Sequence, residues 1–219
     1  MISPLSPSDQ TAYAAFDQAI AEENTISPDY KLVLDENGVL IYKFKPSNGD
    51  PAIIKSYVTF EMIPPATLAK LLFRDEIRQK YDEPLESFGV LESRGDFECI
   101  YYMVINPPMA LISRRDFVTR KFDILNYKGA EEIVVMTSCD HHLKPAQSSP
   151  VRGTMHNNTR IVRPNPSGPG SVLFCIMQMD MGGNIPSGIM ESKATDMPKE
   201  MKSRIIQFYK KCQSTGELL

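Results

Sequence analysis

The 219-residue sequence has no tryptophan, three histidines and only four cysteines. Cys99, Cys139, Cys175 and Cys212 lie far apart, and their spacing matches neither a zinc site nor a redox-active pair. Cysteines without such a motif are typical of proteins that stay in a reducing compartment. We therefore expect free thiols in an intracellular, cytoplasmic protein.

Long apolar runs and a strong net charge are also missing. No stretch approaches the roughly eighteen apolar residues that a membrane-spanning helix needs. Residues 1–7 lack the basic and apolar regions of a signal peptide. The formal net charge is only −3, so no basic field favours nucleic acid as a partner. These absences predict one soluble, unprocessed domain over residues 1–219.

The sequence motifs of common enzymes are absent as well. It has no Gly-x-Ser-x-Gly nucleophile motif, no glycine-rich phosphate loop and no credible cysteine–histidine pair. Cys139-Asp140-His141-His142 contains metal-ligating residue types, but adjacent side chains point apart and no third, distant ligand is evident. We predict no catalytic residue, no metal and no cofactor; a hydrolase or cyclase built in a cavity is the alternative of a different class.

The patterning that is present combines an N-terminal helix with a long series of strands. Ser6-Pro7-Ser8-Asp9 has the hydroxyl cap, early proline and early acid of a helix start, and the helical pattern ends near Asn24. Pro64-Pro65 opens a second helical stretch. Nine segments read as strands: Lys31–Leu34, Val39–Phe44, Ile53–Met62, Leu85–Glu92, Glu98–Ile105, Arg115–Ile124, Glu131–Thr137, Val151–Val162 and Ser171–Asp180.

Short, turn-like connections between the later strands predict an antiparallel meander, because parallel strands need long crossovers. The segment from Val172 to Met179 is apolar on both faces, which indicates a sheet covered on both sides. The final segment can supply one cover, since its apolar residues recur at helical spacing, and Pro198 should kink or interrupt that helix. The apolar stripe comprises Ile185, Ile189, Met197, Met201, Ile205, Phe208 and Tyr209.

The stretch from Pro107 to Phe122 organises the chain, because it joins a proline-stiffened apolar loop to a strand. Its Pro-Pro…Arg-Asp-Phe-Val run resembles the core signature of the START (StAR-related lipid transfer) domain. Four more matches occur in the family's order across almost the whole chain: Ile77-Arg78-Gln79-Lys80-Tyr81-Asp82; Val151-Arg152-Gly153 leading to Ile161-Val162-Arg163-Pro164; Gly168-Pro169-Gly170-Ser171; and Asp180-Met181-Gly182-Gly183-Asn184-Ile185-Pro186.

The resemblance implies an α+β helix-grip fold, in which a strongly curved antiparallel sheet of nine strands grips the C-terminal helix. An N-terminal helix and short helices after the third strand complete that fold. It also implies a tunnel that holds one lipid. We therefore expect a monomeric lipid-binding and lipid-transfer protein, peripheral to membranes. Two alternatives stay open: an apolar interior that is simply a packed core, and a lipid-sensing interaction module.

The motif around Arg78 is closest to the phosphatidylcholine-carrying branch, where the matching arginine binds the lipid phosphate. A planar guanidinium suits a phosphodiester in a dry site, and an ordinary solvated arginine is the alternative. That branch cages the quaternary ammonium with three aromatic rings by cation–π attraction. The matching positions are approximately Tyr102, Phe117 and His156, of which the histidine has a structural role as its alternative.

Sterol-carrying members often have an acid and an arginine buried on neighbouring strands. The matching positions here are Met103 and Lys121, so the acid is absent. A lysine that points inward would require an anionic or carbonyl-bearing group on the ligand. The resemblance therefore favours a phospholipid, phosphatidylcholine-like in the first instance, with a sterol as the alternative ligand. Another phospholipid head group, such as ethanolamine or a more anionic one, stays open.

START proteins are thought to open between the terminal helix and a loop at this place in the chain. We expect Met109, Leu111 and Ile112 to form a membrane gate that inserts shallowly into the bilayer. The alternative is a loop that packs onto the body beside a solvated helix face. The expected lid-helix residues are Ile189, Met197, Met201 and Ile205, and the residues expected to favour anionic head groups are Lys199, Lys202, Arg204, Lys210 and Lys211.

Overall fold

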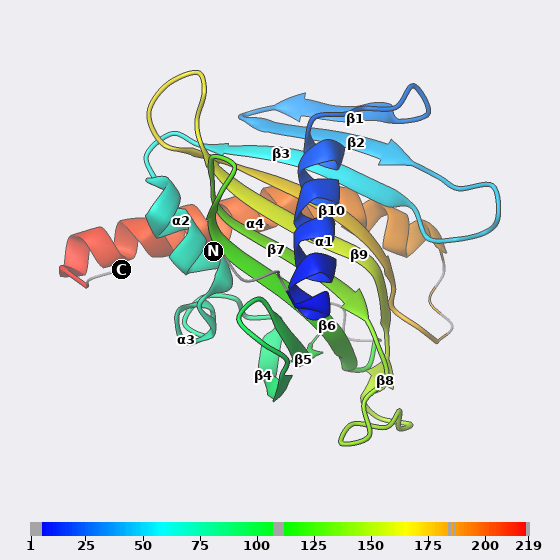
Figure 1. The fold of residues 1–219 in the computed structure, drawn as a ribbon. Helices are drawn as coiled ribbons and strands as arrows, with labels where there is room; N and C mark the ends of the chain where they lie inside the picture. Colours follow the sequence, from blue (N-terminus) through cyan, green and yellow to red (C-terminus); the bar gives the residue numbers. More distant parts are fainter. Residues whose placement is uncertain (1–5, 107–111, 184, 186, 218–219) are drawn as a thin grey trace.

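The computed structural model describes residues 6–106, 112–183, 185 and 187–217, with only the backbone described for residues 187–192 and 194. A ten-stranded sheet with the order β1-β2-β3-β10-β9-β7-β6-β5-β4 dominates it, and the short β8 pairs with β6 (Figure 1). The strands are β1 Lys31–Glu36, β2 Val39–Phe44, β3 Ile53–Phe60, β4 Leu85–Ser93, β5 Glu98–Ile105, β6 Arg115–Tyr127, β7 Ala130–Ser138, β8 Val151–Arg152, β9 Thr154–Pro164 and β10 Ser171–Asp180. The helices are α1 Pro7–Glu23, α2 Pro65–Phe73, α3 Asp75–Arg78 and α4 Ser187–Thr215.

Neighbouring strands pair antiparallel, as their connections predict, with one exception. β8 runs parallel to the start of β6, through the pairs Arg115↔Val151 and Asp116↔Arg152. The single predicted strand Val151–Val162 is therefore divided at Gly153. A Cβ on Gly153 would stand 2.3 Å from the Phe117 ring, so the close packing of these two residues excludes any larger side chain.

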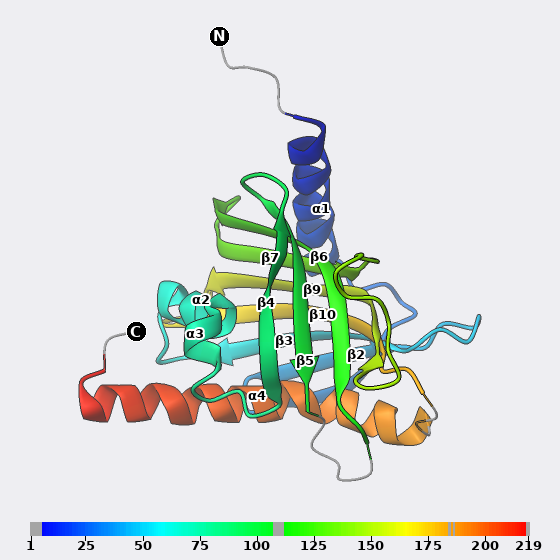
Figure 2. The ribbon, with the colours of Figure 1, turned by 90° about the horizontal axis from the view of Figure 1, so that it is seen from below.

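Two helices cover opposite faces of the sheet (Figures 1 and 2). We call the face under α1 the outer face, and the face under α4 and α2 the inner face. α1 begins at the predicted cap, where Ser6 accepts a hydrogen bond from the Asp9 backbone and the Asp9 carboxylate accepts one from the Ser6 backbone. The helix ends at Glu23, one residue before the predicted end. Its one buried apolar stripe explains why it lies flat on the sheet.

The core of the outer face is aromatic. Phe16 of α1 is fully buried, and its ring meets those of Phe97 and Phe122 edge-on, each with 6.4 Å between centroids. Tyr13 adds two further edge contacts at 5.4 Å, to Phe97 and Tyr127. Edge-to-face pairs at these separations stabilise beyond the area they bury. The rings therefore hold α1 tightly against the sheet.

The inner face is covered by the 29-residue α4, which continues through Pro198. The predicted interruption of the helix at this proline does not occur. Proline removes one backbone donor from a helix, but Pro198 is itself buried, so packing against the sheet compensates for the lost bond. The helix lies across the concave side of the curved sheet in Figure 2, which is the helix-grip arrangement that the sequence predicts.

Candidate functional site

The inner face carries three of the residues predicted to bind a ligand. Met103 and Phe117 belong to its apolar core. Lys121 lies four residues after Phe117 on β6, and strand alternation therefore turns it to the same face. Its Nζ lies 5.6 Å from the centre of the Tyr101 ring, which also belongs to the inner core. Tyr101, which the sequence reasoning missed, is thus the inward aromatic residue of β5.

Tyr102 and His156 lie outside this face, so the predicted three-ring cage does not assemble. Tyr102 follows the inward Tyr101 and pairs across the strands with Val118, and Lys144 covers its ring at 4.3 Å. His156 is exposed and follows the inward Met155. A bulge in the pairing of β9 with β10 falls at this residue, between the pairs Gln178↔Asn157 and Met179↔Met155. Only Phe117 of the three positions can contact a ligand on the inner face.

Lys121 was predicted to pair with an anionic or carbonyl-bearing group of the ligand. In the structure it pairs with an acidic side chain of the protein instead. Its Nζ forms an ion pair with Asp123 at 3.0 Å. Beside it, Arg74 forms two parallel hydrogen bonds to the fully buried Glu132, at 2.8 and 2.9 Å. Burial raises the pKa of Glu132 to about 7. The nearby Asp123 also raises it, whereas the attraction of Arg74 lowers it without reversing the shift. The cations at this end of the inner face, Lys121 and Arg74, therefore both have carboxyl partners within the protein.

Arg78 also lies on the inner side, at the end of α3, and has a carboxylate partner. One of its terminal nitrogens donates to Asp82 at 2.7 Å. Burial acts to lower the pKa of Arg78, but Asp82 outweighs burial and leaves the pKa raised. Arg204 of α4 approaches the same carboxylate at 3.8 Å. Tyr81 closes the group, since its ring stacks on Phe208 of α4 with 5.0 Å between centroids.

Arg160 and Cys175 face each other in the middle of the inner face. They are directly opposite in the pairing of β9 with β10. Protein surrounds both so completely that burial lowers the pKa of Arg160 and raises that of Cys175 to about 11. Yet each keeps part of its surface accessible to water. The sequence analysis predicted neither residue. The pattern that could have identified Arg160 is a charged residue at a position of an apolar strand whose side chain faces inward.

The predicted lid residues of α4 separate into two groups. Ile205 is fully buried in the inner core, and Met201 packs against it. Met197 is exposed and does not belong to the core, whereas Ile185, which precedes the helix in the predicted stripe, packs against it. The side chain of Ile189 lies outside the described part. Phe208 and Cys212 continue the buried stripe toward the C-terminal end of the helix.

The basic residues expected to face head groups are not all free to do so. Arg204 points toward Asp82, and Lys202 donates to the Asn37 carbonyl at 2.6 Å. Lys199 pairs with Asp196 on its own helix at 3.2 Å. Lys210 and Lys211 are exposed.

Of the predicted gate residues, Met109 and Leu111 lie outside the described part and Ile112 is half-buried. Next to them, the buried Arg115 joins the start of β6 to the segment that precedes α4. Its Nε donates to the Met181 carbonyl at 2.9 Å and a terminal nitrogen donates to the Gly182 carbonyl at 3.2 Å. A further donor reaches the Ser113 carbonyl. We call this set the Arg115 clasp, and it explains why arginine stands in that position of the signature.

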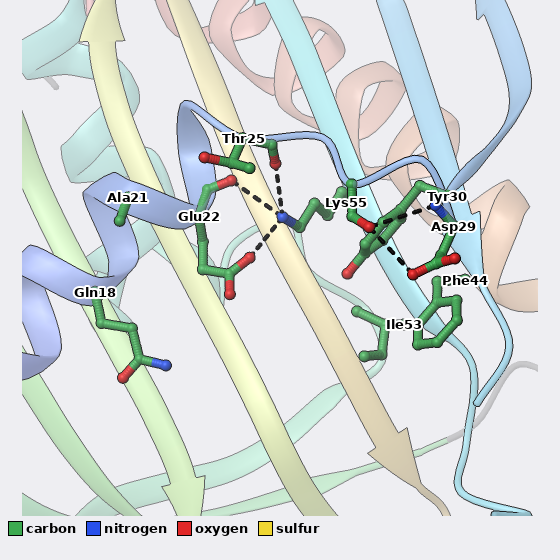
Figure 3. A pocket seen from close by; sticks show the side chains of 10 residues that line it. Gln18, Ala21, Glu22, Thr25, Asp29, Tyr30, Phe44, Ile53 and Lys55 are labelled. Atoms are coloured by element: carbon green, nitrogen blue, oxygen red, sulfur yellow. Dashed lines mark hydrogen bonds and ion pairs between the residues drawn. The ribbon is translucent and has the colours of Figure 1, made fainter. Parts of the chain in front are cut away.

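A separate pocket of about 380 Å³ lies on the outer face, between the end of α1 and β3 (Figure 3). Lys55 stands at its centre, with a nearly fully buried side chain. Figure 3 shows its Nζ donating to the Glu22 carboxylate at 2.6 Å and to the carbonyls of Glu22 and Thr25 at 3.1 and 3.0 Å. All three donors of the ammonium are occupied, so the lysine holds the end of α1 in place and offers nothing to a ligand.

The cluster Cys139-Asp140-His141-His142 is not a metal centre. His141 lies 3.1 Å from the Glu92 carboxylate, and its ring packs against that of His142. The described residues contain no group of three or more potential ligand side chains in metal-binding geometry. Nor does any helix in the described ranges combine the length and apolar character needed to span a membrane.

The family model of the START domain matches residues 25–209, which is most of the chain. This chain belongs to the START domain family. The match begins after α1 and ends within α4, so it contains every strand that the structure describes and the inner-face residues described above, apart from Cys212. No curated protein matches the sequence significantly.

Solved START structures share the fold at low sequence identity. Human StAR-related lipid transfer protein 5 aligns with a TM-score of 0.79 and 19% identity, over 92% of this chain and 97% of that one. Human STARD10 aligns with a TM-score of 0.76 and 19% identity, over 97% and 85%. The lipid transfer and protein localization domain of human StarD13 gives a TM-score of 0.66 and 22% identity, over 93% and 96%. These likenesses establish the helix-grip fold of this START chain.

Proposed function

We propose that this START domain is a lipid carrier that encloses one phospholipid between the inner face and α4 and exchanges it at membrane surfaces. One observation carries the proposal. Arg160 and Cys175 lie directly opposite each other on the inner face of the sheet, and both are only half-buried. Exposed surface on the covered side of the sheet supports an open space beside them.

The mixed chemistry of the inner face suits an amphiphile. Apolar side chains such as Met103, Phe117 and Leu173 form most of it, and the ion pair of Arg78 with Asp82 supplies the polar part. Moving a methylene out of water is worth about 0.8 kcal/mol, so a lipid with roughly thirty methylenes cannot cross water alone at a useful rate. An enclosed apolar face removes most of that barrier, while the charged groups recognise a head group.

The proposal names a phospholipid and does not commit to choline. A choline head group needs aromatic faces around its ammonium, and of the three predicted positions only Phe117 lies on the inner face. A sterol is the second candidate, but the charged groups around Arg78 exceed what a single hydroxyl can satisfy.

Native mass spectrometry of the purified protein, followed by lipid extraction, tests the proposal. We expect one phospholipid per protein. The double variant Arg78→Ala/Asp82→Asn should lose that phospholipid, and replacing both partners avoids leaving an uncompensated buried carboxylate. The matched control is Arg114→Ala, which removes a surface arginine paired with Glu86 and should keep the lipid.

The outcomes separate the candidate functions. A sterol alone would favour the sterol-binding reading, and a chemically altered lipid would indicate an enzyme. Lipid that is retained but never delivered to acceptor vesicles would indicate a sensing module. A protein that accepts no lipid from vesicles of any composition would overturn the carrier proposal.

A further inference from the structure

Arg160 differs from the cations around it because it has no acid of its own. Arg74 pairs with Glu132, Lys121 with Asp123 and Arg78 with Asp82, all at 3.0 Å or less. The Arg160 guanidinium makes neither a hydrogen bond nor an ion pair with any residue that the structure describes. Arg160 is half-buried on the covered side of the sheet, where a cation without a counter-charge is disfavoured. Its place at the centre of the inner face therefore favours an anion from outside the chain.

The protein groups that face Arg160 cannot supply this anion. The thiol opposite, Cys175, stays protonated near neutral pH because burial raises its pKa to about 11. The carboxylate of Asp82 is engaged at 2.7 Å by Arg78 and is also approached by Arg204. Tyr81 is neutral, since burial raises its pKa. Arg204 has Glu200 at 3.9 Å as a second partner, so the charges of Arg78, Asp82, Arg204, Glu200 and Arg160 together leave one positive charge in excess.

The sign of this excess charge selects among phospholipids. A zwitterionic head group brings a phosphate and an ammonium, so it leaves the local excess unchanged. Of the three positions predicted to cage the ammonium, only Phe117 lies on the inner face in the part of the chain that the structure describes. A head group with net negative charge neutralises Arg160 and can accept its planar fork of donors.

We propose that Arg160 binds an oxyanion of the cargo, and that the cargo is a phospholipid with a net negative charge. This inference rests on the proposed carrier function and specifies its ligand class. It assigns Arg160, beside the ion pair of Arg78 with Asp82, to recognising the net charge of the head group.

Uptake from mixed vesicles tests the assignment. Lipid-free protein is incubated with vesicles of equal phosphatidylcholine and phosphatidylglycerol with identical acyl chains, re-isolated, and its lipid is quantified by mass spectrometry. We expect the wild-type protein to enrich phosphatidylglycerol by about tenfold or more. Arg160→Gln should still take up lipid but lose that preference, and a tenfold change corresponds to about 1.4 kcal/mol.

Arg163, three residues after Arg160, provides a matched control. Arg163 lies on the same strand but faces outward, where it pairs with Glu23 at 2.7 Å. Arg163→Gln should keep the wild-type preference. A second measurement guards against misfolding: lipid-free Arg160→Gln should melt no lower than lipid-free wild type, because it loses a half-buried cation that has no partner among the described residues.

The outcomes distinguish the assignment of Arg160 from the proposed carrier function. Uptake of both lipids without preference, or a preference that survives in Arg160→Gln, overturns the assignment and leaves the carrier function standing. No uptake by the wild-type protein overturns both. Glycerol 3-phosphate at the same concentration should not displace bound phosphatidylglycerol. If it does, the site binds a free phosphate ester instead of a lipid.

Discussion

The two faces of the sheet are built from the same strands but differ in how they are filled. On β10, Phe174 points to the outer face and is almost fully buried against Tyr57, at 5.0 Å between ring centroids. Its neighbour Cys175 points to the inner face and keeps accessible surface. At this point of the sheet a ring covers the outer side chain, whereas the inner side chain keeps open surface. Strand alternation thus gives two neighbouring residues of β10 different packing.

A pair of buried glutamates shows the same contrast. Glu98 on the outer face and Glu132 on the inner face each form two hydrogen bonds to one arginine, Arg120 and Arg74 respectively. Hydrogen bonding from Arg120 lowers the pKa of Glu98, while burial raises that of Glu132. Burial therefore outweighs the ion pair at Glu132, whereas the ion pair outweighs burial at Glu98.

The largest loss of stability should come from a mutation that creates a cavity in the core of the outer face. Phe174→Ala is expected to lower the free energy of unfolding by about 3–5 kcal/mol, because it leaves a cavity among packed rings. Urea denaturation measures this loss. Cys175→Ala, its neighbour on the inner face, is the control and should lower it by less than about 1 kcal/mol. Equal losses in the two variants would contradict the contrast between the faces.

The second prediction concerns pH. Since the pKa of Glu132 rises from 4.5 unfolded to about 7 folded, the folded state binds the extra proton between these values. The free energy of unfolding should therefore fall as pH rises from 4.5 to 7, by on the order of 1–3 kcal/mol, and Glu132→Gln should remove this slope.

Glu98→Gln provides a control of opposite sign. The pKa of Glu98 is lowered, so its ion pair stabilises above the unfolded value and is lost as pH falls through the folded one. Glu98→Gln should therefore be less stable than wild type at neutral pH and approach it in acid. Urea midpoints measured from roughly pH 2 to pH 8 follow both variants, because this range spans the titration of both carboxylates. Parallel profiles would refute the assignment.

A smaller effect is expected at the start of α1. Ser6→Ala removes the capping box and should lower the free energy of unfolding by about 1 kcal/mol, measurable as a lower melting temperature. Thr11→Ala is the control, because its hydroxyl bonds only to the Pro7 carbonyl within the same helix and should be close to neutral. Lipid uptake should be unchanged in both variants, since α1 lies on the outer face.

The smallest change in stability is expected where the largest side chain is added. Cys175→Phe should leave the free energy of unfolding within about 1 kcal/mol of wild type if an internal space receives the ring, whereas a filled core would lose about 1–3 kcal/mol. The same variant should take up less lipid from vesicles. A strongly destabilised Cys175→Phe would show that the inner face is solidly packed.

Much of the fold could be predicted because the local signals are strong. The Ser6 cap, the nine alternating segments and the apolar stripe of the last helix all correspond to observed elements. The division of β8 from β9 was missed, since it depends on the packing of Gly153 against Phe117, which are distant in the sequence. Likewise α4 continues through Pro198 because tertiary packing overrides local propensity.

The site was harder to predict, because side-chain direction depends on register. A shift of one residue reverses the face of a strand residue, and this error placed Tyr102 in the cage instead of Tyr101. The bulge at His156 cannot be seen in β9 alone, since it is defined by the pairing with β10. The importance of Arg160 lies in a missing partner, which only the three-dimensional arrangement can show.

The Arg115 clasp constrains how this molecule can open. One guanidinium holds the carbonyl of Ser113, just before β6, together with those of Met181 and Gly182, just before α4. A motion that parted these two segments would break several charge-assisted bonds at once. The end of β10 is thus held to the start of β6 by a single side chain. We therefore expect cargo to enter elsewhere than between these two segments, which the clasp keeps joined.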